Sequence, residues 1–261
     1  MAEAARRLDL LDTGPRFSAA EVAALNARFA QIATRDMLAA VLDEGLAGRI
    51  AAVSSFGAES AVLLHLIASV DPGVPVLFLE TGKHFPETLA YRDELAARLG
   101  LTNLINLTAD PAALARRDES GLRWSYDPDG CCEIRKVQPL AKALVAFDAS
   151  FTGRKGFQSA TRAGLATFEI DTTDALGRLK VNPLAGWSTD QVEAYLAATG
   201  LPRHPLVAQG YPSIGCSPCT TKVAPGEDAR SGRWQGWDKT ECGIHGEVRS
   251  AELPPGYEPF L

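Results

Sequence analysis

The sequence lacks long apolar runs, an excess of positive charge and internal repeats. No apolar stretch approaches the ~20 residues that cross a bilayer, so we expect no membrane-spanning segment. The 26 Lys and Arg residues are outnumbered by 32 Asp and Glu residues, which gives a net charge of −6. Proteins that bind nucleic acids generally carry a basic surface, so this balance argues against them as partners.

The chain also starts without the basic segment and apolar run of a secretory signal. Its first residues, MAEAARRLDLLDT, are too polar for that role. We therefore expect a cytoplasmic protein. In that reducing compartment, cysteine patterns indicate metal binding or catalysis more often than disulfides.

Cysteine is scarce, but the 5 residues are informatively distributed. Cys131 and Cys132 are adjacent, Cys216 and Cys219 form a C-x-x-C pair, and Cys242 stands apart near the C-terminus. Four thiolates can hold one metal centre, which leaves the fifth available as a nucleophile. Disulfides or inert buried thiols are the alternative, which the reducing compartment disfavours. A bond between the adjacent pair would also close a strained ring.

A set of four thiolates suits a structural zinc ion as well as a four-iron, four-sulfur (4Fe-4S) cluster. Zinc sites usually place a few residues between the two sulfurs of a pair, and the pair Cys131-Cys132 has none. A cluster offers four separate iron atoms, so adjacent cysteines can each bind a different one. The spacing therefore favours the cluster, with zinc as the alternative.

Apolar segments that fit strands alternate with segments that fit helices. This alternation predicts an α/β fold with a doubly wound, mainly parallel sheet. Helix caps are expected at Ser18, with Glu21 completing a capping box, and at Ser188. The expected strands are 49–53, 74–79, 103–107 and 149–152. The expected helices include one before residue 48, one over 61–67, one ending near residue 99, one reaching about residue 147, and one over 189–198.

The chain divides into three predicted parts. Residues 1–48 form an N-terminal tail and helix, 49–224 a nucleotide- and cluster-binding domain, and 225–261 a C-terminal catalytic tail. The tail is rich in glycine, so we expect a mobile segment that closes over substrate and opens again. Trp234 and Trp237 are expected to anchor it by packing.

Polar loops follow the first two predicted strands. The loop 54–60 offers hydroxyls, a glycine and backbone N–H groups just before a helix, an arrangement that favours anionic oxygens. Ligands of such sheets sit at the carboxyl ends of the strands. We therefore predict a nucleotide site that includes Ser54, Ser55, Gly57, Thr81 and Gly82.

Positive side chains gather beside the cysteines and after the strand at 149–152. Solvated surface charge is the simpler interpretation of any one of them. Their joint placement at strand ends nevertheless predicts a pocket for an anion. The group comprises Arg135, Lys136, Arg154, Lys155 and Arg162.

Three motifs can now be compared with known families. They are Cys131-Cys132-x-x-Arg135-Lys136-x-x-Pro139-Leu140, Gly215-Cys216-x-Pro218-Cys219-Thr220 and Glu241-Cys242-Gly243-Ile244-His245. Together they resemble the assimilatory adenylyl-sulfate reductases, which belong to the adenosine-phosphosulfate and phosphoadenosine-phosphosulfate reductase family. The likeness runs from about residue 49 to residue 246. It implies a fold like that of the adenine nucleotide α-hydrolases, a 4Fe-4S cluster, adenylyl sulfate as substrate, and thioredoxin or a glutaredoxin-like protein as reductant.

The resemblance also implies roles for particular residues. Cys242 would attack the sulfur of adenylyl sulfate and displace AMP, and a thiol of the reductant would then release sulfite. His245 is a second catalytic candidate. Lys136, Arg230 and Arg233 match basic positions that would meet the phosphosulfate. Both a monomer and a homo-oligomer are compatible with this activity.

Three other functions are weighed against this one. A 3′-phosphorylated substrate is less expected, because family members with the four cysteines generally use the unphosphorylated nucleotide. An ATP-pyrophosphatase of the same fold acting in tRNA thiolation would carry Ser-Gly-Gly-x-Asp-Ser, where this chain has Phe56 and Glu59 in place of a glycine and the aspartate. A non-catalytic metal-binding module would leave Cys242 without a role.

Overall fold

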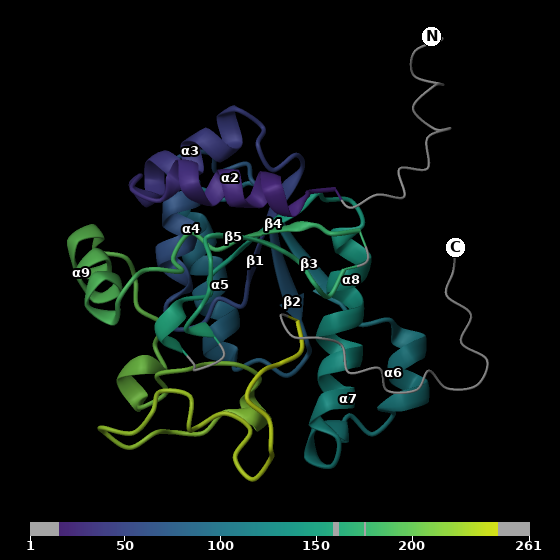
Figure 1. Ribbon diagram of the computed structural model, residues 1–261. Coiled ribbons are helices and arrows are strands. Elements are labelled where there is room, and N and C mark those ends of the chain that lie inside the picture. The colour runs from purple at the N-terminus through teal and green to yellow at the C-terminus, as the bar shows by residue number, and fades with distance from the viewer. Residues whose placement is uncertain (1–15, 159–161, 175, 245–261) are drawn as a thin grey trace, which may run out of the picture.

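A computed structural model describes residues 16–158, 162–174 and 176–244. Its strands form one six-stranded sheet in the order β3-β2-β1-β4-β6-β5 (Figure 1). All neighbours pair in parallel except β5 and β6, which are antiparallel. The predicted mainly parallel, doubly wound sheet is confirmed. The strands are Ile50–Ser54 (β1), Val76–Glu80 (β2), Leu104–Thr108 (β3), Ala149–Thr152 (β4), Phe168–Ile170 (β5) and Leu179–Val181 (β6).

The helices follow the predicted positions in most places. Ser18 caps the first described helix and Ser188 caps α9, each with a complete capping box. The α-helices are Ala19–Phe29 (α2), Thr34–Asp43 (α3), Ser60–Ala68 (α4), Pro86–Leu99 (α5), Pro111–Arg117 (α6), Pro128–Cys132 (α7), Gln138–Leu144 (α8) and Thr189–Thr199 (α9). Shorter 3-10 segments are Arg123–Ser125 (η1), Gly156–Gln158 (η3), Val207–Gln209 (η5) and Ser217–Cys219 (η6).

The prediction of one helix before residue 48 was wrong, because the structure has both α2 and α3 there. The second helix presents only a short apolar stripe, formed by Met37, Leu38 and Val41, which is easily missed between polar neighbours. Val22 and Phe29 of α2 enter the same hydrophobic cluster as that stripe and the sheet. Residues 16–48 therefore contribute to the main core, and the boundary at 48 stays a prediction.

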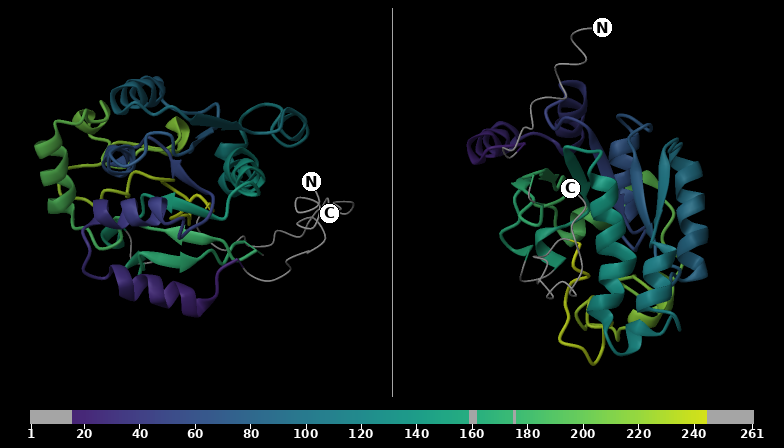
Figure 2. Two further views of the ribbon diagram at one scale, coloured as in Figure 1. Left: turned by 90° about the horizontal axis from the view of Figure 1, so that it is seen from above. Right: turned by 90° about the vertical axis from the view of Figure 1, so that its right-hand side faces the viewer.

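Two hydrophobic clusters cover the two faces of the sheet. Alternate residues of a strand point to opposite faces, so Ala52 packs with α4, α5 and α9 while Ala51 packs with α8. Leu140 and Leu144 are the residues of α8 that cover that second face. Figure 2 shows α8 lying along one side of the sheet. Helices on both faces bury the parallel strands, as this architecture requires.

The strand order changes direction at β1, whose two neighbours β2 and β4 come from opposite halves of the fold. In open parallel sheets, ligands bind at such a switch point, outside the carboxyl ends of the strands. Figure 1 shows α2 and α3 at the opposite end of the sheet, and residues 201–244 at the carboxyl end. The described part of the C-terminal tail, residues 225–244, has turns and bends there instead of helices or strands.

One helical column, residues 128–144, joins the first cysteine pair to the core. It starts as α7, continues as a π-helix over Glu133–Val137 (η2), and ends as α8. Pro139 explains the wider middle, because it has no N–H to donate and its ring would clash with the carbonyl of Arg135 in an α-helix. Cys132 and Lys136, four residues apart in this column, are close enough for their charges to interact.

No helix within the part of the chain that the structure describes is both long and apolar enough to cross a membrane.

Candidate active site

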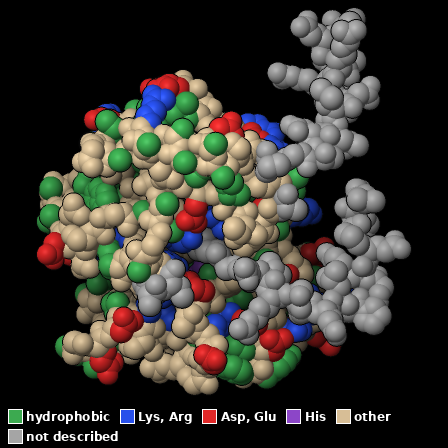
Figure 3. All heavy atoms as spheres, in the orientation of Figure 1, with side chains coloured by type: hydrophobic (Ala, Val, Ile, Leu, Met, Phe, Trp, Pro, Cys, Tyr) green, Lys and Arg blue, Asp and Glu red, His purple; other side chains and the backbone are tan. Residues whose placement is uncertain are grey.

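A cleft of about 290 Å³ lies at the switch point of the sheet. Most of its lining comes from the loop after β1, the residues that follow β4, the segment 212–215 and the C-terminal tail, and a few residues of α4, the end of β2 and the π-helical segment complete it. Figure 3 shows Lys, Arg, Asp and Glu side chains around a hollow on this face of the molecule. The volume is close to the smallest that hold a small-molecule ligand.

The loop after β1 lines the cleft as predicted, through Ser54, Ser55 and Gly57. The hydroxyl of Ser54 accepts a hydrogen bond from the backbone N–H of Phe56 at 3.2 Å. Phe56 adopts a φ of 48°, in the left-handed region that favours glycine, and its ring is fully buried. Burial of the ring offsets the strain of that backbone. A phenylalanine can therefore occupy the position where glycine was expected for the pyrophosphatase alternative.

The first residues of the loop after β2 lie outside the cleft. Thr81 and Gly82 are not among the residues that line the cleft, as far as the described residues define it. The hydroxyl of Thr81 instead lies 3.3 Å from the sulfur of Cys216, and its carbonyl accepts a bond from Nη1 of Arg135 at 2.8 Å. This loop supports the cysteines, and Leu79 and His84 line the cleft from the same strand end.

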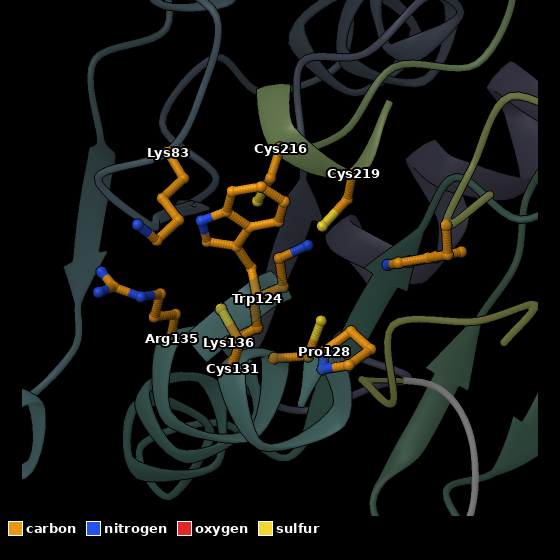
Figure 4. Close-up of a pocket in the computed structure, with 10 residues that line it drawn as sticks. Lys83, Trp124, Pro128, Cys131, Arg135, Lys136, Cys216 and Cys219 are labelled. Atoms are coloured by element: carbon orange, nitrogen blue, oxygen red, sulfur yellow. The ribbon is translucent and has the colours of Figure 1, made fainter. Parts of the chain in front are cut away.

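The four paired cysteines line a single pocket next to the cleft. In Figure 4, the side chains of Cys216 and Cys219 extend from η6 toward Cys131 on α7, with the indole of Trp124 among them. All five cysteines are free thiols, so the disulfide alternative finds no support here. Within residues 16–158, 162–174 and 176–244, no three Cys, His, Asp or Glu side chains converge tightly enough for a single metal ion.

Burial and charge act in opposite directions on these sulfurs. Burial raises the pKa of Cys132 to about 11. Burial also works to raise the pKa of Cys216, but the ammonium group of Lys136 and the Thr81 hydroxyl outweigh it and lower the pKa. For Lys136, burial acts to lower the pKa, while the sulfurs of Cys216, Cys242 and Cys132 raise it above its ordinary value. The ammonium ion therefore sits where thiolates are stabilised.

The predicted cations differ in how they are paired. Arg154 pairs with Glu169, Lys155 with Glu59 at 2.8 Å, and Arg162 with Glu241 at 2.7 Å. Arg230 lies 3.4 Å from Glu241, and Arg135 contacts Asp118 at 2.6 Å. Among the residues that the structure describes, Lys136 and Arg233 have no carboxylate partner within salt-bridge distance. Both line the cleft and both are largely enclosed by protein.

Cys242 lines the same cleft as these two cations, in contrast to the other four cysteines. The tail that carries it is held at three points. Lys239 pairs with Asp129, Glu241 pairs with Arg162, and Ile244 packs on the hydrophobic cluster beneath α8. His245, the second predicted catalytic residue, lies outside the described residues.

The two tryptophans of the tail behave differently. Trp234 is buried and its ring faces the guanidinium of Arg233 at 4.4 Å, so it anchors the tail as predicted. Trp237 is 43% exposed, and the prediction that it packs was wrong. Gly236, with a φ of 83°, turns the chain between them and leaves the second indole at the surface.

Several residues of the site were not predicted from the sequence. Gln158 and Glu241 link the paired cations, and Asp118 holds Arg135 beside the cysteine pocket. Trp124 and His84 line the two cavities. Glu241 stands next to Cys242 in the quoted motif, and that adjacency was the one signal available.

The doubly wound sheet, the loop at its switch point and the adjoining cysteine pocket define a nucleotide-binding α/β protein with a thiol at the ligand cleft. Comparison with known sequences gives the family. Residues 49–222 match the profile of the phosphoadenosine phosphosulfate reductase domain. The chain belongs to the phosphoadenosine phosphosulfate reductase family.

Curated relatives cover most of the chain. A protein of Mesorhizobium japonicum named adenosine 5'-phosphosulfate reductase is 51% identical over 241 residues, which is 92% of this chain and 93% of the relative. A protein of the same name from Rhodococcus opacus is 42% identical and covers 81% of this chain and 85% of its own.

Solved structures share the fold at low sequence identity. The phosphoadenylyl-sulfate reductase of Candida auris superposes with a TM-score of 0.64 at 24% identity, covering 79% of this chain and 98% of the other. The FMN adenylyltransferase of Candida glabrata gives 0.52 at 17% identity, covering 79% and 77%. This agrees with the expected likeness to the adenine nucleotide α-hydrolase fold.

Proposed function

We propose that this chain is an adenylyl-sulfate reductase, which reduces adenosine 5'-phosphosulfate to sulfite and AMP in sulfate assimilation with a thioredoxin-like dithiol protein as electron donor. One observation carries the proposal. Cys242 lines the cleft at the switch point of the sheet, the other four cysteines line the neighbouring pocket, and Lys136 lines both. The names of the relatives support the same substrate.

The first step is nucleophilic substitution at the sulfate sulfur. The thiolate of Cys242 attacks this sulfur, a new S–S bond forms, and the bond between sulfur and the bridging oxygen breaks. The bridging electron pair leaves with AMP. The product is an S-sulfocysteine on the tail.

The second step transfers two electrons from the dithiol partner. One partner thiolate attacks the sulfur of Cys242, which releases sulfite and leaves a mixed disulfide. The partner's second thiolate then attacks the partner's first sulfur in the mixed disulfide. This step regenerates the Cys242 thiolate and leaves the partner with an internal disulfide. The exchange requires access to Cys242, which supports a tail that opens between the steps.

Two cations are well placed for the anionic substrate. Lys136 and Arg233 border the cleft with no carboxylate partner among the described residues, so their charge is available to a phosphosulfate. Cations in such a water-poor site stabilise the charge that develops on the leaving phosphate. Ser54, Ser55 and Gly57 are expected to bind the nucleotide from the loop after β1. Arg154, Arg162 and Arg230 line the same cleft, already paired with carboxylates.

The cysteine pocket suits a 4Fe-4S cluster better than a single zinc ion. Its four cysteines line one cavity beside Lys136, and the adjacent pair Cys131-Cys132 can bind two separate iron atoms more readily than one zinc ion. Cys131, Cys132, Cys216 and Cys219 would hold the cluster. When bound, it would supply four fixed Fe–S bonds that lock η6 against the helical column carrying Lys136.

The metal assignment is tested by analysis of anaerobically purified protein. Iron and acid-labile sulfide in equal amounts, about four of each per chain, are expected for one cluster. About one zinc per chain without iron would contradict the assignment.

The reaction is tested with adenosine 5'-phosphosulfate labelled in its sulfate group. Intact-protein mass spectrometry should show one sulfite equivalent on wild-type protein, released by reduced thioredoxin. Cys242→Ser should bind AMP but gain no adduct. An adduct that persists in Cys242→Ser would overturn the proposed nucleophile.

The preferred nucleotide is measured by competition. The ratio of kcat/KM values for adenosine 5'-phosphosulfate and its 3′-phosphorylated form defines specificity. We expect the unphosphorylated form to be preferred, in line with the names of the relatives. A higher kcat/KM for the 3′-phosphorylated form would assign the alternative substrate instead.

A further inference from the structure

Glu241 directly precedes the proposed nucleophile and is tied to two arginines. Its carboxylate lies 2.7 Å from Nη2 of Arg162 and 3.4 Å from Nη2 of Arg230. The Arg162 side chain is 11% exposed and that of Glu241 23%. Such a pair is shielded from water more than a surface salt bridge, so it can fix a position as well as neutralise charge.

The same pair is continuous with the nucleotide loop. Nη1 of Arg162 donates to Oε1 of Gln158 at 2.6 Å, and Nε2 of Gln158 donates to Glu59 at 3.2 Å. Glu59 precedes α4 and also accepts from the buried Lys155. A chain of charged and polar contacts therefore runs from the loop after β1 to the residue beside Cys242.

Two contacts hold the tail just before the nucleophile, and they are made to different elements. Lys239 pairs with Asp129 of α7, while Glu241 pairs with Arg162, which lies in the segment between β4 and β5. Two attachment points on separate elements define both the position and the direction of the peptide between and beyond them. A thiol in line with a scissile bond must be placed to within about an ångström, which one flexible tail cannot do unaided.

We propose that Glu241 is the positioning residue for the nucleophile: its ion pair with Arg162 docks the tail so that Cys242 faces the cleft. The inference rests on the proposed function for the identity of the nucleophile. The sequence predicted that Arg162 binds substrate, whereas in this proposal Arg162 binds the tail. The substrate's charge is left to Lys136 and Arg233, which have no carboxylate partner in the described part of the chain.

A rival interpretation makes the opposite prediction. If Arg162 were a substrate site, Glu241 would be an internal anion that occupies it, and removing its charge would tighten nucleotide binding. If Glu241 positions the tail, removing its charge should leave nucleotide binding unchanged and slow the attack. The variant Glu241→Gln separates the two because it keeps size and shape. Asp238→Asn is the matched control, since it removes one negative charge at an exposed position of the same tail.

Three measurements on the cluster-containing enzyme test the proposal. In Glu241→Gln, alkylation of Cys242 by iodoacetamide without substrate should rise about tenfold, read by peptide mass spectrometry. The single-turnover rate of S-sulfocysteine formation should fall about tenfold. The Kd of adenosine 5'-phosphosulfate, measured in the Cys242→Ser background, should change less than twofold. Asp238→Asn should match wild type in all three.

Arg162→Ala and Glu241→Ala complete a double-mutant cycle. Residues that act as one contact are non-additive, so the double variant should be no slower in adduct formation than the slower single variant. Additive losses would overturn the proposal, as would a Kd that falls tenfold in Glu241→Gln or alkylation equal to wild type. If wild-type enzyme forms no adduct at all, the proposed function fails, while the alkylation assay still reports independently whether Glu241 docks the tail.

Discussion

The hydroxyl of Thr81 lies 3.3 Å from the sulfur of Cys216 and joins the loop after β2 to the C-x-x-C turn. The same oxygen accepts the backbone N–H of Lys83 at 3.2 Å. Gly82, between them, has a φ of 67°, which lets the loop fold back over its own strand end. A loop predicted to bind nucleotide thus serves as part of the wall of the cysteine pocket.

Replacing Thr81 by valine should therefore destabilise the protein without blocking nucleotide binding. The change keeps the shape but leaves a buried N–H and a thiol without their partner, at a cost of about 1–2 kcal/mol. Urea denaturation measures the loss. Thr102→Val, which removes an exposed hydroxyl, should lie within about 0.5 kcal/mol of wild type. An equal loss in both variants would contradict the role given to Thr81.

Lys136→Met should lower kcat/KM by about 10²–10³ because it removes a charge from a site where water screens it little. Methionine keeps most of the side-chain volume, so the fold should persist. Steady-state kinetics with reduced thioredoxin measure the effect, and Lys142→Met at an exposed position of α8 is the control. A loss below about fivefold would show that Lys136 does not act on the reaction.

Phe56→Gly should lower the free energy of unfolding even though it relieves a strained backbone. Glycine at this position relieves about 1–2 kcal/mol of strain in the left-handed backbone. Loss of a buried phenyl ring costs about 3–5 kcal/mol. The ring packs edge-on against Phe78 at 5.6 Å, so the cavity would lie within the core. We expect a net loss of about 2 kcal/mol by chemical denaturation. A stabilised variant would mean that strain dominates.

His204 should make the stability of the protein depend on pH. Burial lowers its pKa from 6.5 to about 4, so the folded protein keeps the ring neutral while the unfolded chain takes up a proton. The unfolded state binds more protons between these values, so stability is full above pH 6.5 and falls as pH drops toward 4. The expected loss is about 2 kcal/mol.

The measurement compares unfolding free energies of wild type and His204→Gln from pH 7 to 4.5. The imidazole contacts the Thr88 hydroxyl at 3.0 Å and accepts the N–H of Leu206, so glutamine can replace part of this bonding. The variant should be less stable at pH 7 but show a shallower decline. Parallel curves would indicate that His204 does not titrate in this window.

Much of the fold follows from local sequence. The serine caps of α2 and α9 and the apolar strands β1 to β4 depend on neighbours within a few residues, so pattern alone located them. Three elements have only weak sequence patterns: the short strands β5 and β6 and the second N-terminal helix, α3. They are stabilised by pairing within the sheet and by packing in the core.

The candidate site divides in the same way. Spacing separated Cys242 from the four paired cysteines, and the structure places it in a different cavity from theirs. Composition could not say which arginine finds a carboxylate, because Arg162 and Glu241 are far apart in sequence. Nor could it say that Trp237 would be exposed while Trp234 is buried.

By itself, the sequence determined the residue types: which thiols are available, which segments form strands, and that the chain carries the motifs of its family. Tertiary structure decided their partners. It turned Thr81 toward a cysteine, paired Arg162 with the tail, and left Lys136 and Arg233 facing the cleft without a carboxylate among the described residues. The physical reason is that charge pairing and burial depend on distances in space. These distances are fixed only when segments that are far apart in the chain pack together.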